Sequence, residues 1–177
     1  IEYARVNKVP YLGLCYGMQL VVVEYARHVL GLKDAHTVEC DPNTKNPVIH
    51  MIEGQAEIMK RRAYGGTMRL GNWECRVSPG TLADLAYIEG HGYDNASQKT
   101  VGERHRHRYE FNNDYTEKIE NAGLVIAGRS VVENLVEIVE LPQDRHPFFL
   151  ATQYHPEYRS TPLMPHPIFS AFCRNLV

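Results

Sequence analysis

The sequence predicts an α/β domain with an open, largely parallel sheet that is flanked by helices and contains an antiparallel section. Short apolar strands alternate with amphipathic helices at both ends of the chain, strand patterns joined by turns occupy the middle, and no internal repeat is visible. Alternation of strands and helices is typical of parallel sheets. The 177 residues, 44% of them hydrophobic, suffice for one globular core.

The N-terminal part predicts a strand that leads directly into a helix. Residues 9–14 form a short apolar run bounded by turn residues, as in a buried strand. Apolar residues then recur every three or four positions from Met18 to Leu30, which places them on one face of a helix. Gly31 is expected to end this helix.

Shorter patterns predict the remaining elements. We expect strands at residues 48–52, 73–77, 124–128, 135–141 and 148–154. We expect helices at residues 81–87, at 114–122 with Asp114 as the N-cap and Gly123 beyond the end, and at 168–176. Residues 41–47 are interpreted as a surface loop, residues 53–62 as an insertion, and residues 65–71 as a glycine-marked turn that enters a strand.

Charge and composition exclude several classes of function. The 19 Lys and Arg oppose 21 Asp and Glu, so no overall positive field attracts nucleic acid or an anionic membrane. No apolar run reaches the roughly 20 residues that span a bilayer, and the first residues are not a signal peptide. The four scattered cysteines lack the spacing of a zinc site and favour a reducing compartment. We therefore expect a cytoplasmic domain with no metal, no nucleic-acid partner and no membrane partner.

Cys15 is the first candidate catalytic residue. It is the centre of Gly13-Leu14-Cys15-Tyr16-Gly17, a G-x-C-x-G motif between the predicted strand and helix, which is the thiol counterpart of the nucleophile elbow. Glycines relieve crowding in such a turn, and the helix N-terminus is expected to lower the thiol pKa. The backbone N–H of Tyr16 would point toward an oxyanion. The alternative is a buried structural cysteine at a tight turn.

A candidate base follows a distant strand. His155 and Glu157 come directly after the apolar run 148–154. Because the carboxyl ends of strands line the crevice of open α/β sheets, we expect His155 and Cys15 at the same edge. His155 would accept the thiol proton, and Glu157 would hold the imidazole tautomer. The alternative for His155 is a strand-end histidine bonded to backbone. Together the three residues predict a cysteine-nucleophile acyl-transfer enzyme.

The motifs resemble those of the class I, or triad-type, glutamine amidotransferases, whose fold is flavodoxin-like. This resemblance rests on the runs 13–19 and 153–157. Four further stretches resemble the glutaminase domain of the CTP synthases, at residues 24–27, 65–71, 103–110 and 127–130. The similarity extends from about residue 3 to residue 172.

The resemblance implies a set of roles in glutamine hydrolysis. It makes Cys15, His155 and Glu157 a catalytic triad that forms a γ-glutamyl thioester, with the Tyr16 amide at the oxyanion. It places the substrate-binding residues Gln19, Glu39 and Arg108 at the α-amino and α-carboxylate ends of L-glutamine. The charges suit this, because an ammonium favours a carboxylate and a carboxylate favours a guanidinium.

Each substrate-binding assignment has a plainer alternative. Glu39 would then be a loop carboxylate, and Gln19 a polar residue on a helix face. The basic run 104–108 would be a solvated loop. With Arg108 as the substrate-binding residue, Arg104 and Arg106 are instead expected to be structural or to face a partner domain.

The resemblance also implies partners. Residues 1–177 would be a glutaminase domain without its N-terminal strand and oxyanion loop, inside a larger protein that forms a homo-oligomer, a tetramer. A synthetase domain of the same polypeptide, absent from this chain, would use the ammonia with ATP and Mg²⁺ to convert UTP to CTP. GTP would be an allosteric activator, and this domain itself would need no cofactor. The alternatives are a stand-alone γ-glutamyl or other cysteine hydrolase, and a catalytically silent regulatory domain.

Overall fold

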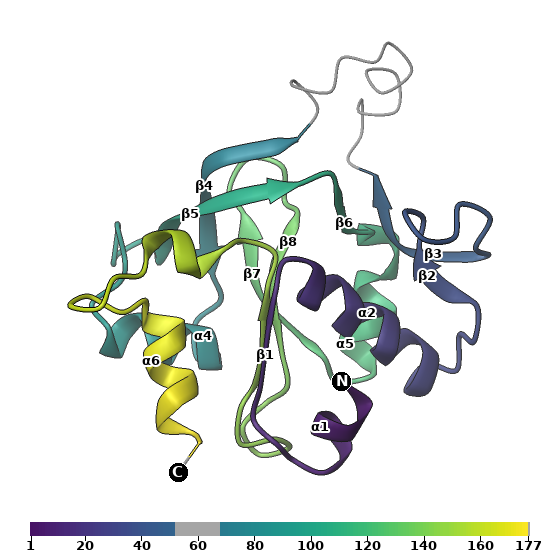
Figure 1. The fold of residues 1–177 in the computed structure, drawn as a ribbon, viewed down its shortest axis with the longest axis horizontal. Coiled ribbons are helices and arrows are strands. Elements are labelled where there is room, and N and C mark those ends of the chain that lie inside the picture. The colour runs from purple at the N-terminus through teal and green to yellow at the C-terminus, as the bar shows by residue number, and fades with distance from the viewer. Residues whose placement is uncertain (52–67, 177) are drawn as a thin grey trace.

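A six-stranded sheet in the order β1-β9-β8-β7-β4-β5 organises the chain. The computed structural model describes residues 1–51 and 68–176, and helices lie on both sides of this sheet (Figure 1). Its strands are β1 (Tyr11–Leu14), β4 (Arg69–Val77), β5 (Thr100–His107), β7 (Val125–Ser130), β8 (Val136–Glu140) and β9 (Phe149–Thr152). A second sheet, in the order β2-β3-β6, contains β2 (Ala35–Thr37), β3 (Asn46–Met51) and β6 (Tyr109–Phe111).

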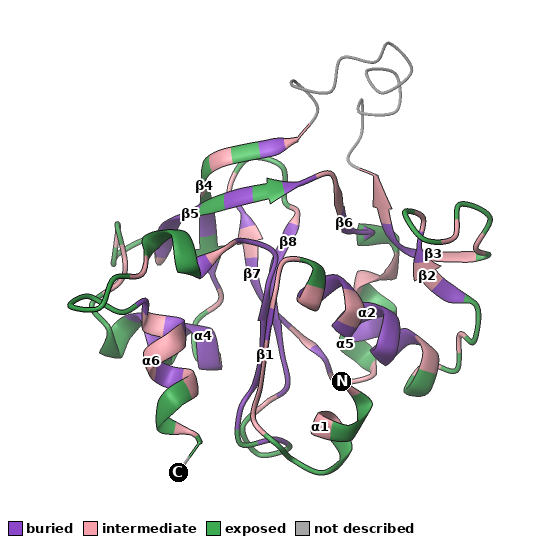
Figure 2. Cartoon of the chain, in the orientation of Figure 1, coloured by how far each residue is buried: buried purple, intermediate pink, exposed green. Residues whose placement is uncertain are grey.

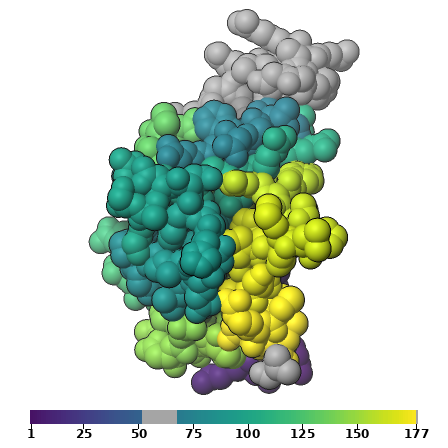
Figure 3. All heavy atoms as spheres, turned by 90° about the vertical axis from the view of Figure 1, so that its left-hand side faces the viewer, coloured from purple at the N-terminus to yellow at the C-terminus, as the bar shows by residue number. Residues whose placement is uncertain are grey.

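The helices form two groups. On one side lie α1 (Glu2–Val6), α2 (Tyr16–His28) and α5 (Thr116–Asn121), and on the other lie α4 (Leu82–Glu89) and α6 (Pro167–Arg174) (Figure 1). Short 3-10 turns, η1 (Asn113–Tyr115) and η2 (Pro156–Arg159), precede α5 and follow β9. Figure 3 shows the C-terminal segment packed beside the segment that carries α4.

Each face of the sheet has its own hydrophobic core. Phe149 and Ala151 pack in the core that includes α2, whereas Phe148 and Leu150 pack in the core that includes α4 and α6. Successive side chains of a strand point to opposite faces, so a continuous apolar run fills both cores. The central strands are accordingly almost entirely buried (Figure 2).

The α/β class is confirmed, but the parallel share of the sheet is smaller than predicted. Within the six-stranded sheet, β1 pairs with β9 in parallel, and the other four strand pairs are antiparallel. For two of these pairs the connections give the reason: residues 131–135 and 141–148 join β7 to β8 and β8 to β9, and neither is long enough for the crossover that parallel neighbours need. The sheet is therefore mixed.

Some predicted boundaries are corrected. Asp114 is not an N-cap: its N–H donates to the side chain of Asn112, and α5 begins at Thr116. Helix α2 ends at His28, and Gly31, with φ of +73°, lies in the turn beyond it. The insertion expected at residues 53–62 and the start of the glycine-marked turn lie outside the described residues. Among the described helices, none has the length and apolar character required to cross a membrane.

Candidate active site

Cys15 occupies a sharp turn between β1 and α2. Its φ of +50° is a strained value for a residue with a side chain, and it serves as the N-cap of α2. Its backbone N–H donates to the carbonyl oxygen of Thr152 at 2.7 Å, so the turn is tied to β9. A Cβ at Gly13 would lie 3.0 Å from the carbonyl carbon of Gly17 and 3.1 Å from Cβ of Ala151. Only glycine therefore fits at this point of the elbow.

The pKa of the Cys15 thiol differs in direction from the sequence-based expectation. Burial raises this pKa, and it outweighs the lowering by the Tyr16 backbone N–H and by the carboxamide of Gln153. The carboxylates of Glu157 and Glu39 raise it further. The expectation was wrong because desolvation of a half-buried sulfur outweighs the favourable helix terminus. A base is thus needed to generate the thiolate.

His155 stands where that base was expected. Leu14 pairs with Thr152 across parallel strands β1 and β9, so the segments that follow them leave the sheet at the same edge. The backbone N–H of His155 donates to the carbonyl oxygen of Arg104 at 2.8 Å. Nδ1 of the His155 ring lies 2.7 Å from Oε1 of Glu157. Because a carboxylate only accepts, Nδ1 carries the proton and Nε2 is left as a proton acceptor. The ring stacks on Tyr158, with centroids 4.9 Å apart.

A cavity of about 250 Å³ opens beside Cys15 and contains the three expected substrate-binding residues. Its lining comprises Cys15, Tyr16, Gln19, Glu39, Met68, Arg106, His107, Arg108 and Tyr109. Gln19 is buried on α2, Glu39 is exposed after β2, and Arg108 is half-buried at the bend between β5 and β6. His155 and Glu157 are not among the lining residues; they lie at the neighbouring end of β9. The thiol of Cys15, the carboxylate of Glu39 and the guanidinium of Arg108 therefore line the same cavity.

The basic run is a strand and not a solvated loop. It forms the end of β5, where Arg104 and Arg106 are exposed while His105 and His107 are 2% and 5% exposed. The alternation of Arg and His over these positions is the period-two signal of a half-buried strand. The charge of the run predicts exposure to solvent, whereas its period of two buries both histidines. Of these, His107 lines the cavity, and His105 is its buried neighbour on the strand.

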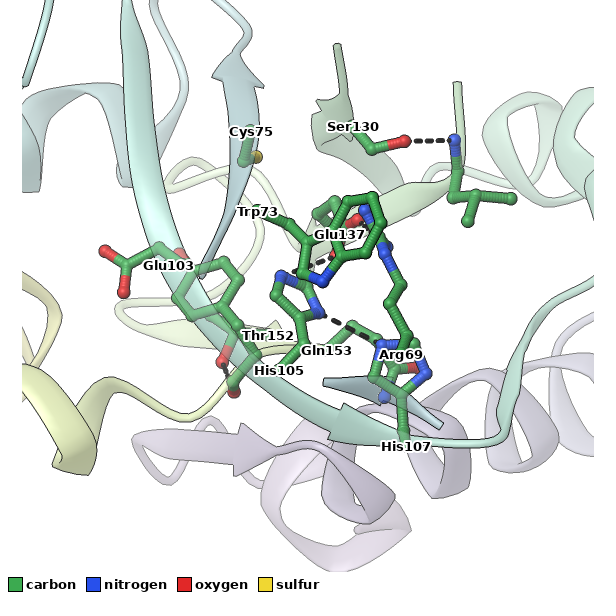
Figure 4. Close-up of polar contacts among 12 residues, drawn as sticks. Arg69, Trp73, Cys75, Glu103, His105, His107, Ser130, Glu137, Thr152 and Gln153 are labelled. Carbon is green, nitrogen blue, oxygen red and sulfur yellow. Dashed lines mark hydrogen bonds and ion pairs between the residues drawn. The ribbon is translucent and has the colours of Figure 1, made fainter. Parts of the chain in front are cut away.

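A buried ion pair behind the cavity was also missed. Arg69 on β4 binds Glu137 on β8, and Arg69 also lies over the Trp73 ring at 4.8 Å. Burial raises the pKa of Glu137 to about 7, although Arg69 opposes that shift. Figure 4 shows His105 between Glu137 and His107. Burial and the charge of Arg69 lower the pKa values of His105 and His107 to about 2 and about 3, so both rings are neutral.

The donor set of this region does not match a metal centre. Nδ1 of His105 lies 3.0 Å from Nε2 of His107, so these nitrogens bind each other. Within residues 1–51 and 68–176, no group of three or more His, Cys, Asp or Glu side chains is arranged to hold a metal ion.

Fold and site together define a class of α/β protein in which a cysteine elbow and a histidine–carboxylate pair follow two neighbouring parallel strands. The chain belongs to the class-I glutamine amidotransferase family, which matches residues 1–175. It is 51% identical over 177 residues to the CTP synthase of Caldanaerobacter subterraneus subsp. tengcongensis, covering 100% of this chain and 30% of that protein. It is 52% identical over 172 residues to the CTP synthase of Nostoc punctiforme, covering 97% of this chain and 29% of that protein.

Two solved structures are similar in fold. The glutaminase domain of Trypanosoma brucei CTPS with bound acivicin superimposes with a TM-score of 0.82 at 32% identity, covering 99% of this chain and 62% of that chain. A putative GMP synthase protein from Thermoplasma acidophilum superimposes with a TM-score of 0.55 at 15% identity, covering 99% of this chain and 61% of that one, a likeness of fold alone. The chain spans about 30% of the length of the curated relatives it matches.

Proposed function

We propose that this chain is the glutaminase domain of a CTP synthase and that it hydrolyses L-glutamine through a thioester on Cys15. The observation that carries the proposal is the cavity that joins Cys15 to Gln19, Glu39 and Arg108. Its charges complement the two ends of an amino acid. The identity of about 50% to proteins named CTP synthase, over nearly the whole chain, supports the particular enzyme.

In this proposal His155 moves the protons. Nε2 of His155 takes the thiol proton, and the Cys15 thiolate attacks the side-chain amide carbon of glutamine. The carbon–nitrogen bond breaks, and His155 gives its proton to the leaving nitrogen, so ammonia departs and a γ-glutamyl thioester remains. Water then gives a proton to His155 and adds to the thioester, which releases glutamate and returns the thiol. Glu157, 2.7 Å from Nδ1, stabilises the charged ring in both steps.

The cavity side chains would orient the substrate. The carboxylate of Glu39 suits the α-ammonium of glutamine, and the guanidinium of Arg108 suits its α-carboxylate. Both N–H groups of the Gln19 carboxamide are engaged, by the Tyr109 carbonyl at 2.9 Å and by Gln153 at 3.3 Å. In this proposal the Gln19 amide oxygen accepts a hydrogen bond from the α-ammonium of glutamine. The Tyr16 N–H supports the oxyanion.

The rest of the activity belongs to the larger protein. We propose that ammonia passes to a synthetase domain of the same polypeptide, which uses ATP and Mg²⁺ to aminate UTP in the cytoplasm. In this proposal GTP activates glutamine hydrolysis, and the whole protein assembles as a homotetramer.

The test is Cys15→Ala in the whole protein, with CTP formation measured from glutamine and from ammonium salt. We expect glutamine-dependent synthesis to be lost and ammonia-dependent synthesis to be kept. Cys173→Ala, an exposed thiol on α6, is the matched control and should keep both. A stand-alone hydrolase would show no ammonia-dependent synthesis, and a silent regulatory domain would be indifferent to Cys15→Ala. Either result would contradict the proposal.

A further inference from the structure

A buried carboxamide points at the proposed nucleophile. Gln153 directly follows β9, is fully buried, and its Nε2 lies 3.6 Å from Sγ of Cys15, within hydrogen-bonding distance of a sulfur. Its backbone N–H donates to the carbonyl oxygen of Glu137 at 2.8 Å, which anchors it to β8. The proposed mechanism gives Gln153 no part.

A backbone carbonyl fixes which way this carboxamide faces. The carbonyl oxygen of Tyr109 only accepts, so the Gln19 atom 2.9 Å away from it must be Nε2. The same Nε2 lies 3.3 Å from the Gln153 carboxamide, and the atom there must therefore be an oxygen. The nitrogen of Gln153 is then the atom that faces sulfur. The donors and acceptors that link Gln19, Gln153 and Cys15 are therefore all fixed by the Tyr109 carbonyl, which can only accept.

His107 also contacts the Tyr109 carbonyl. Its Nδ1 lies 2.9 Å from the Tyr109 oxygen, and because that oxygen accepts, Nδ1 carries the proton and Nε2 is bare. His105 then donates from Nδ1 to this bare nitrogen at 3.0 Å (Figure 4). The two neutral, buried rings thus hold the Tyr109 carbonyl in place. The orientation of the Gln19 and Gln153 carboxamides follows from that carbonyl.

We propose that Gln153 is a further catalytic residue, whose carboxamide N–H donates to the Cys15 thiolate, and that His107 is a positioning residue for it. The inference rests on the proposed role of Cys15 as nucleophile. A thiolate forms when His155 takes the proton and again when the thioester collapses. A half-buried sulfur anion near the carboxylates of Glu39 and Glu157 needs hydrogen-bond donors to compensate for lost water.

The proposal is tested through the acidity of the thiol in the whole protein without glutamine. The rate at which iodoacetamide alkylates Cys15 is followed against pH by peptide mass spectrometry. We expect Gln153→Met, which keeps the volume and removes the donor, to raise the apparent thiol pKa by about one unit. The alkylation rate near pH 7 then falls on the order of tenfold. Gln153→Asn keeps an amide but withdraws it from sulfur, so it should raise the pKa too and decides the matter if Gln153→Met does not fold.

His107 is tested by the same measurement. His107→Phe deletes the donor to Tyr109 and is expected to raise the thiol pKa, whereas His107→Asn, which can place an amide nitrogen near the position of Nδ1, should restore it. A purely structural role for His107 would leave the thiol pKa unchanged in both variants, and that result would overturn the positioning role.

The matched control is a buried polar group away from the sulfur. The Tyr87 hydroxyl donates to Glu103 at 2.8 Å and lies 2.8 Å from the Tyr154 hydroxyl, so Tyr87→Phe removes a comparable buried contact. It should lower the melting temperature and leave the alkylation profile of Cys15 unchanged. An unchanged profile in the folded Gln153 variants, or an equal shift in Tyr87→Phe, would overturn the role of Gln153. Because no glutamine is used, this outcome is independent of whether the protein releases ammonia.

Discussion

The backbone N–H of Cys15 donates a 2.7 Å hydrogen bond to the carbonyl oxygen of Thr152. This bond continues the parallel register of β1 and β9 by one step beyond the Leu14–Thr152 pair. It ties the elbow to the strand from which His155 emerges, three residues later. The placement of the thiol relative to the histidine segment is therefore a property of sheet pairing and does not depend on a flexible loop.

Gly13→Ala tests the crowding on which this elbow depends. A new methyl would lie 3.0 Å from the Gly17 carbonyl carbon and 3.0 Å from the Tyr11 ring. The Gly17 backbone can move away only at a cost in stability. We expect a loss of about 2 kcal/mol in the free energy of unfolding, measured by urea denaturation. Gly17→Ala is the matched control, since its methyl would meet only the Tyr11 hydroxyl at 3.8 Å. Equal stability of the two variants would contradict the crowding argument.

The strand-to-helix elbow and the histidine strand were predictable because they depend on local chemistry. The glycines around Cys15, the helical stripe after it and the apolar run before His155 each reflect a constraint within a few residues. The mixed sheet was less accessible, because strand direction depends on how short connections are used, and composition does not encode that.

The buried polar groups could not be predicted, because they depend on partners far apart in sequence. Arg69 and Glu137 lie on strands that are not neighbours in the sheet, and each looks in sequence like a surface charge. His105 and His107 alternate with arginines, so in sequence the run resembles a cluster of exposed charges. Gln153 stands out only as part of a motif, because its partner Cys15 is 138 residues away in sequence.

Glu157→Gln tests the histidine–carboxylate pair. The carboxamide introduced by the substitution can still accept a hydrogen bond from Nδ1 of His155, but it does not neutralise the protonated ring. The kcat for hydrolysis of the substrate glutamine should therefore fall on the order of a hundredfold. Because the side chain of Glu157 is 43% exposed, the loss should be smaller than that of Cys15→Ala. Ammonia release from glutamine is the measurement, and a rate within twofold of the unaltered protein would contradict the assignment.

Glu39→Gln tests substrate orientation. Removing the carboxylate proposed to face the α-ammonium should raise the KM for glutamine roughly tenfold or more, with a smaller effect on kcat. Asp41→Asn, an acidic side chain on the same segment outside the lining of the cavity, is the control and should leave KM unchanged. An unchanged KM in Glu39→Gln would remove Glu39 from the substrate site.

Glu137 predicts a pH dependence of stability. Its folded pKa of about 7 lies above the ordinary value of 4.5, so between these values the folded state binds more protons than the unfolded state. Its contribution to the free energy of unfolding should be complete below pH 4.5 and lost as pH rises through 7, by on the order of 3 kcal/mol.

Comparison with a variant isolates this contribution. Urea unfolding at pH 5 and pH 8 should show that Glu137→Gln lacks this part of the decline, because its amide does not titrate. Glu89→Gln, which changes a carboxylate in an exposed pair with Arg174, should decline like the unaltered chain. A decline in Glu137→Gln equal to that of the unaltered chain would show that Glu137 does not titrate in this range.

The central claim, that Cys15 is the nucleophile for glutamine, is tested most directly by covalent labelling with a glutamine-like electrophile. Peptide mass spectrometry then follows the four cysteines, which are all free thiols. The account predicts that Cys15 is modified well before Cys40, Cys75 and Cys173 and that glutamine protects it. Equal modification of the exposed thiols Cys40 and Cys173, without protection by glutamine, would contradict it.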